Sequence, residues 1–592
     1  MENRPDHVSV ERGGVGNMAR IRKVEIANFR SIQSLEWRPS AGLNCLIGPG
    51  DSGKSTILDA IDLCLGARRT IQFTDADFHN LDVESPISIS LTLGELADGL
   101  KNIDTYGLYL RGFDADSGEV EDEPERDLET VLTLNLSVGD DLEPVWSLVS
   151  DRAKAQDTSR NLTWGDRVQL APTRIGASAD HNLGWRRGSV LNRLSDEKAD
   201  AAAALAKAAR EAREAFGDQA EGQLEETLAI VSEAAKELGV DVGDNVRALL
   251  DAHSVTFTGG TISLHNEQGI PLRGLGTGSA RLLVAGLQRR SAKESSLLLV
   301  DELEHGLEPH RIIRLIGSLG GKEVPPPLQV FMTTHSPIVL RELSGAQLWI
   351  VRERDAEHDV LNVGSENDVQ SAIRLYPDAF LASSVIVSEG ASEVGLVRGL
   401  DQHRYSNGST SIMALGVSLI DCGGGGANRP YERAAALHRL GYVVAVLRDD
   451  DQKPNAATEK AFTDAGGTVL TWRDGRTIED ELFASLPDQS VIELVDYAIE
   501  LHGDELIDAH IKQASNNAQT LGDVRNEALL DGLSKETRAK LGAASQFKKA
   551  GWFKSVSWME HVGRTIVGPV LAESDPSFQD RIEAIFSWSA DV

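Results

Sequence analysis

The chain has 592 residues, a formal net charge of −32 and three cysteines. This length predicts several domains, each able to bury a core. The negative charge excludes a general polyanion binder, but a local basic strip or a bridging metal would still permit nucleic-acid binding. The sequence contains no uninterrupted run of about 18 apolar residues, so it predicts no membrane span. Cys45, Cys64 and Cys422 lack metal-ligand spacing and favour a reducing cytoplasm.

The first segments of the chain predict a leader and the start of an α/β domain. Residues 1–17 are polar, without the apolar core of a signal peptide, and we expect a flexible leader there. Residues 21–47 contain two short apolar strands. A helix should follow, because Ile57, Ile61 and Leu65 recur at helical spacing.

The segment "GPGDSGKST", residues 48–56, lies between the second of these strands and the helix. It matches the P-loop pattern, which requires a strand before it and a helix after it. Glycines let backbone N–H groups turn toward phosphates. Lys54 would reach the β- and γ-phosphates, and the Ser55 hydroxyl would bind Mg²⁺. The sequence thus predicts an ATP site whose nucleotide-binding residues include Gly48, Gly50, Gly53, Lys54, Ser55 and Thr56.

An acidic pair ends a later apolar strand, "LLLVDE", in Asp301 and Glu302. A P-loop enzyme needs a second acid near its metal and a group that polarises the attacking water. We assign the first role to Asp301, as a nucleotide and Mg²⁺ residue, and the second to Glu302. His335 ends the next strand, in "QVFMTTHSP", and is placed to sense the γ-phosphate.

The order of these motifs resembles the ABC-type ATPases of the SMC/RecF group, which also share the "NFRS" at 28–31. In that group a glycine-rich signature, here "GLGTGSAR" at 274–281, reaches across a dimer to the partner's ATP. The resemblance therefore implies nucleotide contacts from Gly276 and Gly278. This sequence departs from the usual L-S-G-G-Q, with Gly276 in place of Ser and Ser279 in place of Gln.

Domain boundaries follow from these segments. We expect the ATPase in two parts, 18–194 and 239–375, separated by 195–238, an alanine-rich charged stretch that predicts a helical dimerisation arm. A second α/β unit should cover 380–500, with a parallel sheet because its strands alternate with helices. Residues 501–592 should be mostly helical and complete that second domain.

Carboxylates gather at the strand ends of this second unit. Glu389 ends one strand, Glu393 lies one helical turn later, and Asp449 and Asp451 follow a later strand. Alternate residues of an extended chain point the same way, so Asp449 and Asp451 can pair while Asp450 points elsewhere. Hard oxygen donors suit Mg²⁺ or Mn²⁺, which predicts a second metal site.

This pattern resembles the Toprim fold, in which a strand-end Glu-Gly is followed by D-x-D. An SMC-like ATPase followed by Toprim resembles the OLD (overcoming lysogenization defect) family of nucleases, the group that includes the nuclease subunit of the Gabija antiphage system. The resemblance implies a further acidic metal ligand, for which Glu479 is our candidate and Glu481 a near-equal choice. It also implies a lysine, Lys554, that stabilises the pentacoordinate phosphate, with Lys548 and Lys549 as backbone-phosphate contacts.

The leading hypothesis is an ATP-hydrolysing, Mg²⁺- or Mn²⁺-dependent DNA endonuclease in phage defence. Its catalytic residues would be Glu302, His335, Glu389, Asp449, Asp451 and Lys554, and its partners DNA, further copies in a dimer or tetramer, and a helicase-like or other defence protein. The alternative is a structural ATPase, a DNA clamp or recombination mediator whose Toprim unit does not cut. Four converging carboxylates favour the nuclease.

Overall fold

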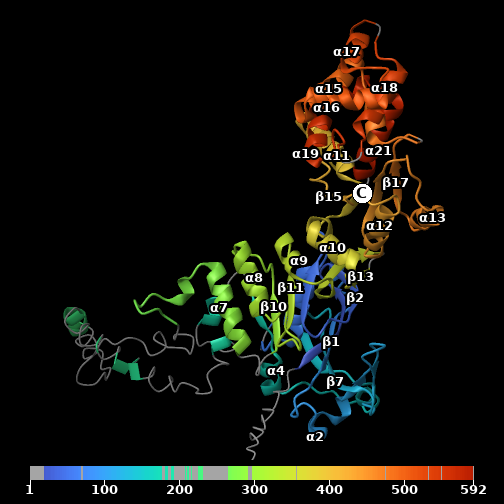
Figure 1. The fold of residues 1–592 in the computed structure, drawn as a ribbon. Helices are drawn as coiled ribbons and strands as arrows, with labels where there is room; N and C mark the ends of the chain where they lie inside the picture. Colours follow the sequence, from blue (N-terminus) through green and yellow to red (C-terminus); the bar gives the residue numbers. More distant parts are fainter. Residues whose placement is uncertain are drawn as a thin grey trace, which may run out of the picture. The chain divides into compact units, whose positions relative to one another are not determined.

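The computed structural model describes residues 19–68, 71–176, 180–183, 189–191, 207–208, 210–211, 215, 224–230, 264–290, 296–354, 357–473, 475–530, 532–547 and 550–590. Figure 1 labels the elements. The chain divides into two compact units. The first comprises residues 1–46, 53–342 and 353–360, and the second comprises 47–52, 343–352 and 361–592. No helix of the described residues has the length and apolar character needed to cross a membrane.

A 13-stranded mixed sheet follows the order β6-β5-β7-β4-β1-β2-β13-β12-β3-β11-β10-β9, with β8 on β7. Its strands are β1 (Arg20–Phe29), β2 (Ile32–Trp37), β3 (Leu43–Ile47), β4 (Ile87–Gly94), β5 (Arg111–Phe113), β6 (Val120–Glu121), β7 (Glu129–Val138), β8 (Pro144–Leu148), β9 (Thr173–Ile175), β10 (Leu297–Val300), β11 (Gln329–Thr333), β12 (Leu348–Arg354) and β13 (Glu357–Asn362). The helices of this part are α1 (Lys54–Leu65), α2 (Ile103–Tyr106), α3 (Asp151–Ala155), α4 (Trp164–Leu170), α7 (Thr277–Arg290), α8 (Pro309–Ser318) and α9 (Pro337–Glu342).

The parallel part of this sheet, β3-β11-β10-β9, carries the P-loop and the acidic pair. β3, β10 and β11 are buried at every residue, as expected of parallel strands covered on both faces. The predicted helix after the P-loop is confirmed as α1, whose Ile57, Ile61 and Leu65 are all buried. Within 21–47 the sequence predicted two strands, and the structure adds β2, which pairs with β1 through a tight turn. Most of the predicted helical arm, 195–238, lies outside the described residues.

The second unit contains a four-stranded sheet in the order β15-β14-β16-β17, and all of its pairs are parallel, as predicted. Its strands are β14 (Ser384–Ser388), β15 (Val417–Asp421), β16 (Val443–Arg448) and β17 (Thr468–Thr471). Its helices are α10 (Asn367–Leu375), α11 (Ala391–Ser406), α12 (Arg429–Arg439), α13 (Ala456–Asp464), α14 (Ile478–Ser485), α15 (Asp488–His502), α16 (Asp504–Ala514), α17 (Leu521–Leu530), α18 (Lys535–Ser545), α19 (Val556–His561), α20 (Gly568–Val570) and α21 (Pro576–Ala590).

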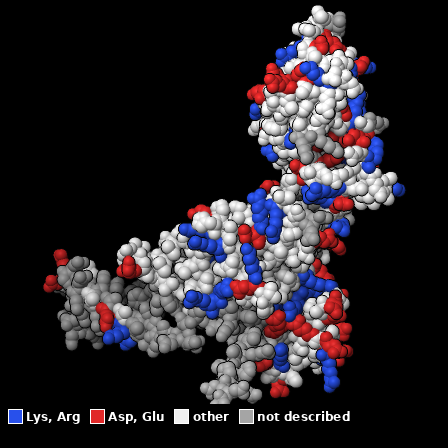
Figure 2. Space-filling view, viewed as in Figure 1, with Lys and Arg blue, Asp and Glu red and all other residues white. Residues whose placement is uncertain are grey.

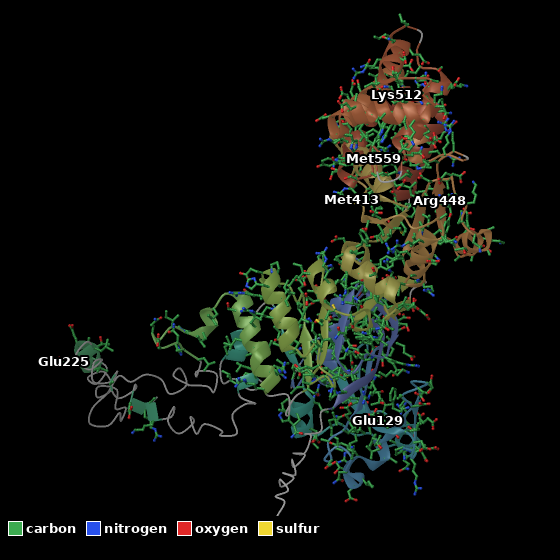
Figure 3. The ribbon with its side chains drawn as sticks, viewed as in Figure 1. Glu129, Glu225, Met413, Arg448, Lys512 and Met559 are labelled. Atoms are coloured by element: carbon green, nitrogen blue, oxygen red, sulfur yellow. The ribbon has the colours of Figure 1, made fainter. Side chains whose placement is uncertain are left out.

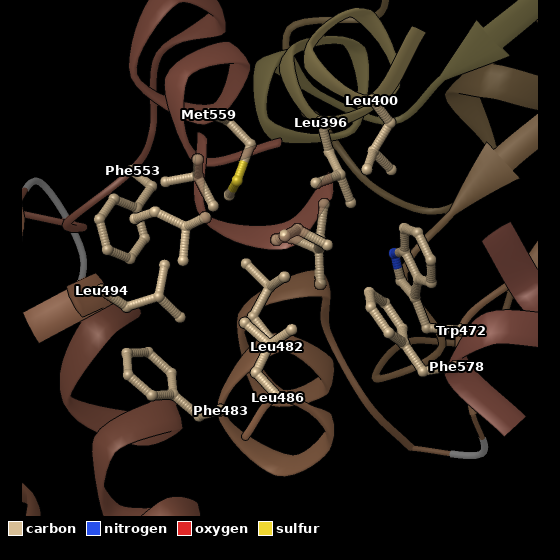
Figure 4. Packing of buried hydrophobic residues seen from close by; sticks show 14 of the residues in the cluster. Leu396, Leu400, Trp472, Leu482, Phe483, Leu486, Leu494, Phe553, Met559 and Phe578 are labelled. Atoms are coloured by element: carbon tan, nitrogen blue, oxygen red, sulfur yellow. The ribbon is translucent and has the colours of Figure 1, made fainter. Parts of the chain in front are cut away.

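One apolar core joins this sheet to the helices that follow it. It includes Leu396 of α11, Leu482 of α14 and the fully buried Trp552 and Phe553 before α19. Figure 4 shows Phe553, Met559, Leu396 and Leu482 around this core. Because α14 and the segment before α19 share the core with α11, their polar residues are held in fixed positions relative to the sheet.

A close helix crossing fixes α19 on α11. A Cβ added at Gly395 would lie 2.5 Å from the carbonyl oxygen of Val556, and one at Gly399 would lie 2.2 Å from that of Glu560. Only glycine permits this backbone approach. Arg398 strengthens the crossing through an ion pair of 3.0 Å with Glu560. The crossing places the chain before α19, which carries Lys554, beside the start of α11, which carries Glu393.

Candidate functional sites

The P-loop backbone depends on its glycines. Gly48 and Gly53 have φ values of 147° and 84°, which L-residues with a side chain rarely adopt. A Cβ at Gly48 would also lie 2.6 Å from the carbonyl oxygen of Val351, whereas Gly50 has open space around it. Lys54, the first residue of α1, is only 5% exposed. The loop therefore has the conformation of a phosphate-binding turn that opens a helix.

Asp301 contacts Ser55, the other predicted Mg²⁺ ligand of the nucleotide site. Its Oδ1 accepts a hydrogen bond of 3.1 Å from the Ser55 hydroxyl and one of 2.7 Å from Thr333. Arg174 of β9 reaches its other oxygen at 3.6 Å and also pairs with Asp59 of α1 at 2.6 Å. The hydroxyl and the carboxylate that suit Mg²⁺ are thus in contact, so these residues fit a nucleotide-bound divalent metal.

The other two predicted ATPase residues lie at the neighbouring strand ends. Glu302 is exposed, its backbone N–H donates to the Thr333 hydroxyl at 2.8 Å, and its φ is 45°. A left-handed glutamate is uncommon, and such strain is typical of functional positions. His335 is exposed, and its N–H donates to Glu304 at 2.7 Å. The Glu302 carboxylate lies 3.5 Å from the ring of His305, and both Glu302 and His335 are accessible from solvent.

The signature segment packs against the residues that follow the acidic pair. A Cβ at Gly278 would lie 2.2 Å from the carbonyl oxygen of Gly306, while Gly276 has nothing within 4 Å. Arg281 is fully buried and donates to the backbone oxygens of His305 and Asp301. Burial lowers the pKa of Arg281 despite nearby carboxylates. Gly278 is therefore required for this packing, and Gly276 is the open position.

The second candidate site is built where β14, β16 and α14 meet. The backbone N–H of Asp449 donates to Glu389 Oε2 at 3.3 Å, and Asp449 Oδ1 accepts from the N–H of Ile478 at 2.8 Å. Ile478 is the first residue of α14, so Asp449 caps that helix from the neighbouring strand end. Glu393 is 3% exposed and accepts from the N–H of Gly390 at 2.9 Å.

Glu479 and Glu481 have different surroundings on α14, although both are fully buried. The ammonium of Lys554 lies 2.7 Å from Glu479 Oε1 and forms an ion pair with it. Glu481 accepts from Arg473 at 2.8–2.9 Å and pairs with Arg476 at 3.3 Å. The structure thus favours Glu479 as the functional acid, because Glu481 is already neutralised by structural arginines.

The buried carboxylates repel one another. Burial, followed by the charges of Glu479 and Glu389, raises the pKa of Glu393 to about 7. Burial and then the charges of Glu393, Glu479 and Glu389 raise the pKa of Asp449 well above its usual value. Burial acts to lower the pKa of Lys554, but Glu479, Asp449 and Glu393 together raise it. Clustered acids of this kind are stabilised by a cation.

The two remaining aspartates differ from each other. Asp450 is 3% exposed and faces its own partners: Arg448, labelled in Figure 3, lies 3.1 Å away and Lys453 2.5 Å away. The N–H of Gly475 also donates to Asp450 at 2.9 Å. Against the effect of burial, these contacts lower its pKa. Asp451 is exposed, and its charge is felt by Glu389.

As the side chains stand, no three His, Cys, Asp or Glu residues in the described ranges are close enough together to hold a metal ion. The ammonium of Lys554 is instead the cation nearest to Glu479. The donor chemistry nevertheless fits Mg²⁺ or Mn²⁺, because all of the grouped residues are carboxylates and Glu479 and Glu393 are buried.

Two contributors to the nucleotide site escaped the sequence analysis. Arg174 has no local motif and lies far along the chain from Asp301, across the insertion. Thr333 had a signal that could have been used, because it ends a buried strand beside the acidic pair and two residues before His335. Lys548 and Lys549 lie outside the described residues.

The P-loop, its Asp301 partner and the strand order define a P-loop ATPase domain. A family model described as "AAA domain, putative AbiEii toxin, Type IV TA system" matches residues 43–341, just over half of the sequence. The chain belongs to this family.

Similarity to curated proteins is confined to short segments. An "OLD nuclease" of Thermus scotoductus is 33% identical over 101 residues, 16% of this chain and 19% of the relative. A "DNA replication and repair protein RecF" of Prosthecochloris aestuarii is 38% identical over 72 residues, 12% of this chain and 20% of the relative. The matched segments thus span about a fifth of each relative's length.

Among solved structures, the SMC head domain from Thermotoga maritima is 14% identical, with a TM-score of 0.28, covering 58% of this chain and 99% of that one. An SMC head bound to the C-terminal winged-helix domain of ScpA is also 14% identical, with a TM-score of 0.30, covering 58% and 97%.

Proposed function

We propose that this protein is an ATP-hydrolysing, divalent-metal-dependent DNA endonuclease of the OLD type, acting in antiphage defence. The observation that carries the proposal is the grouping of three acids, Glu393, Asp449 and Glu479, whose charges repel one another beside the ends of β14 and β16. The ammonium of Lys554 balances one of these charges, at Glu479, and a bound divalent cation would balance the others. The short similarity to an OLD nuclease supports the assignment.

In this proposal Glu389, Glu393, Asp449, Asp451 and Glu479 hold Mg²⁺ or Mn²⁺ in a Toprim-type site. The bound metal would activate water and stabilise the leaving 3′-oxygen. Lys554 would pair with the phosphate that is cut, and its raised pKa keeps it protonated for that contact. In the other domain, Ser55 and Asp301 hold the nucleotide's metal, Glu302 orients water, and His335 faces the γ-phosphate.

DNA binding would depend on local features and not on total charge. Figure 2 shows basic and acidic side chains interspersed over the face in view, which is consistent with a net charge of −32. We also propose a homo-oligomer, because the signature around Gly276 and Gly278 would complete a second copy's ATP site. Light scattering that found only monomers, with ATP hydrolysis proportional to protein concentration, would contradict this assembly.

The alternative, a structural ATPase that binds DNA without cutting it, has one observation in its favour. Lys554 already neutralises Glu479, and the acids of the described residues do not enclose a common point. A supercoiled-plasmid nicking assay separates the two functions. With Mg²⁺ or Mn²⁺ we expect nicked and linear products, and EDTA should abolish them. Comparing reactions with and without ATP shows whether the nucleotide changes the rate of cutting.

A further inference from the structure

A glycine-rich loop joins β15 to α12 in the second unit. Gly423, Gly424, Gly425 and Gly426 have φ values of 69°, 68°, 107° and 104°. Four successive left-handed residues are accessible only to glycine without strain. A Cβ at Gly423, Gly424 or Gly426 would meet nothing within 4 Å. The glycines are therefore needed for the course of the backbone, and they leave open space beside it.

A cavity of about 370 Å³ lies between this loop and α12. Gly425 and Gly426 line one side of the cavity, and Arg429, Glu432 and Arg433 of α12 line the other. The N-terminus of α12 adds the positive end of a helix dipole to this space, although the N–H groups of Gly423 and Gly424 already donate to Asp421 and Glu389. The two guanidinium groups add full positive charge to the same space.

Neither arginine of this cavity has an acidic partner among the described residues. Arg433 is only 8% exposed, and it donates hydrogen bonds to the carbonyl oxygen of Asp421 at 3.3 Å and to the sulfur of Cys422 at 3.9 Å. Arg429 donates to the carbonyl oxygen of Gly424 at 3.1 Å. Within the described residues no carboxylate oxygen lies within 4 Å of either guanidinium, in contrast to Arg448 and Arg473 of the same unit. Buried charges are normally paired, so the buried Arg433 is suited to receive an anion from outside the chain, and the exposed Arg429 lies beside it.

The loop is tied to the proposed nuclease site. The N–H of Gly424 donates to the carbonyl oxygen of Glu389 at 3.0 Å, and the N–H of Cys422 donates to that of Ser388 at 3.0 Å. A ligand in the cavity is thus held at the same sheet edge as the Glu389 carboxylate. Glu432 also lines the cavity, and its negative charge offsets one of the two arginines. The remaining net charge of the lining is about +1, which one singly charged anion would balance.

We propose that this cavity binds a backbone phosphodiester of the DNA strand, next to the phosphate that is cut. The inference rests on the proposed nuclease function and adds a DNA contact to it. A phosphodiester carries one negative charge and accepts several hydrogen bonds, which matches two guanidinium groups and a glycine-rich backbone. The contact would be independent of base sequence, since it reads only the backbone.

The test is DNA binding without cleavage, measured by fluorescence anisotropy on the full chain in EDTA with a labelled duplex. Arg429→Gln should weaken binding equally for unrelated sequences and reduce the salt dependence of log K by about one unit. Glu432→Gln should strengthen binding, because it removes a negative charge from the same cavity. Arg439→Gln, at the exposed far end of α12, is the charge-matched control and should bind as wild type. Arg429 is exposed, so its loss should leave the melting temperature unchanged.

Wild-type affinity and salt slope in Arg429→Gln would overturn the inference while leaving the nuclease proposal intact. A wild-type chain that neither binds nor cuts the duplex would remove both. A melting experiment with inorganic phosphate tests whether the cavity binds free phosphate instead of the DNA backbone. If phosphate raises the melting temperature of wild type but not of Arg429→Gln, and DNA binding is the same in both, the cavity takes free phosphate and the DNA contact is wrong.

Discussion

The ammonium nitrogen of Lys554 lies 2.7 Å from a carboxylate oxygen of Glu479. Glu479 lies on α14 and Lys554 lies in the loop before α19, and the core that includes Leu482, Trp552 and Phe553 brings the two segments together. The ion pair links the C-terminal segment to the acids on the sheet edge. It also distinguishes Glu479 from Glu481, two positions further along α14, because Lys554 pairs with Glu479 whereas Arg473 pairs with Glu481.

Isosteric substitutions at these two glutamates should have opposite effects. Glu479→Gln should abolish plasmid cutting and change the free energy of unfolding by no more than about 1 kcal/mol. The variant loses the ion pair with the half-exposed Lys554, but it also loses the repulsion between Glu479 and the acids Glu393 and Asp449. Glu481→Gln should cost about 1–3 kcal/mol, because Arg473 and Arg476 would lose the carboxylate that they share and Arg473 would keep only Asp575. Urea denaturation and a nicking assay on both variants test this. A stable, inactive Glu481→Gln together with an active Glu479→Gln would reverse the assignment.

The raised pKa of Glu393 predicts a pH effect on stability. Between its usual value of 4.5 and about 7, the folded chain holds this proton more tightly than the unfolded chain. The free energy of unfolding should therefore fall from pH 5 to pH 8, by about 3 kcal/mol from this group. Glu393→Gln should lack this contribution, so the difference between wild type and variant measures it. Identical pH profiles of the two proteins would show that Glu393 ionises normally.

Lys54→Ala should weaken ATP binding at least about tenfold, because the only lysine of the P-loop supplies the charge that faces the β- and γ-phosphates. Isothermal titration calorimetry measures the affinity, and circular dichroism checks the fold. Unchanged ATP affinity in a folded variant would mean that the loop does not bind the nucleotide in this way.

The two signature glycines provide a matched pair. Gly278→Ala places a methyl group against the carbonyl oxygen of Gly306 and should cost about 1–3 kcal/mol and slow ATP turnover. Gly276→Ala meets open space in the isolated chain and should leave stability unchanged. If Gly276→Ala nevertheless slows turnover, the open position is occupied in an assembled ATPase, which supports the proposed oligomer. Equal melting temperatures for both variants would argue against the packing role of Gly278.

Periodicity and strand-end motifs predicted much of this architecture. The buried strands β3, β10 and β11 and the parallel sheet of the second unit follow from short apolar runs. Most of these runs end on glycine or on acids, and the run of β11 ends just before His335. The choice between Glu479 and Glu481 could not follow, because it depends on which side of α14 faces Lys554. A sequence signal was available in Thr477 and Asp480, whose side chains form a capping box and fix where α14 begins.

Other features had weaker signals or none. Gly395 and Gly399 lie four residues apart, a spacing that favours a close helix crossing and could have indicated the contact with α19. Arg174 reaches Asp301 only through the pairing of β9 with β10, which no local pattern encodes. The sequence predicted that Asp449 and Asp451 pair while Asp450 points elsewhere. Asp450 has its own partners, and the pairing of Asp449 with Asp451 stays a prediction. Asp450 also stabilises the fold through ion pairs with Arg448 and Lys453. These contacts could not be predicted from the sequence, because they depend on how the chain bends after β16.

The most direct test of a metal-dependent nuclease compares Asp449→Asn with Asp450→Asn in a supercoiled-plasmid assay with Mn²⁺. Asp449 faces the other acids, so its variant should fold and hydrolyse ATP but cut no detectable DNA. Asp450 holds Arg448, so its variant should lose about 1–3 kcal/mol of stability but still cut below its melting temperature. Wild-type cutting by Asp449→Asn would contradict the carboxylate site and favour a non-cleaving ATPase.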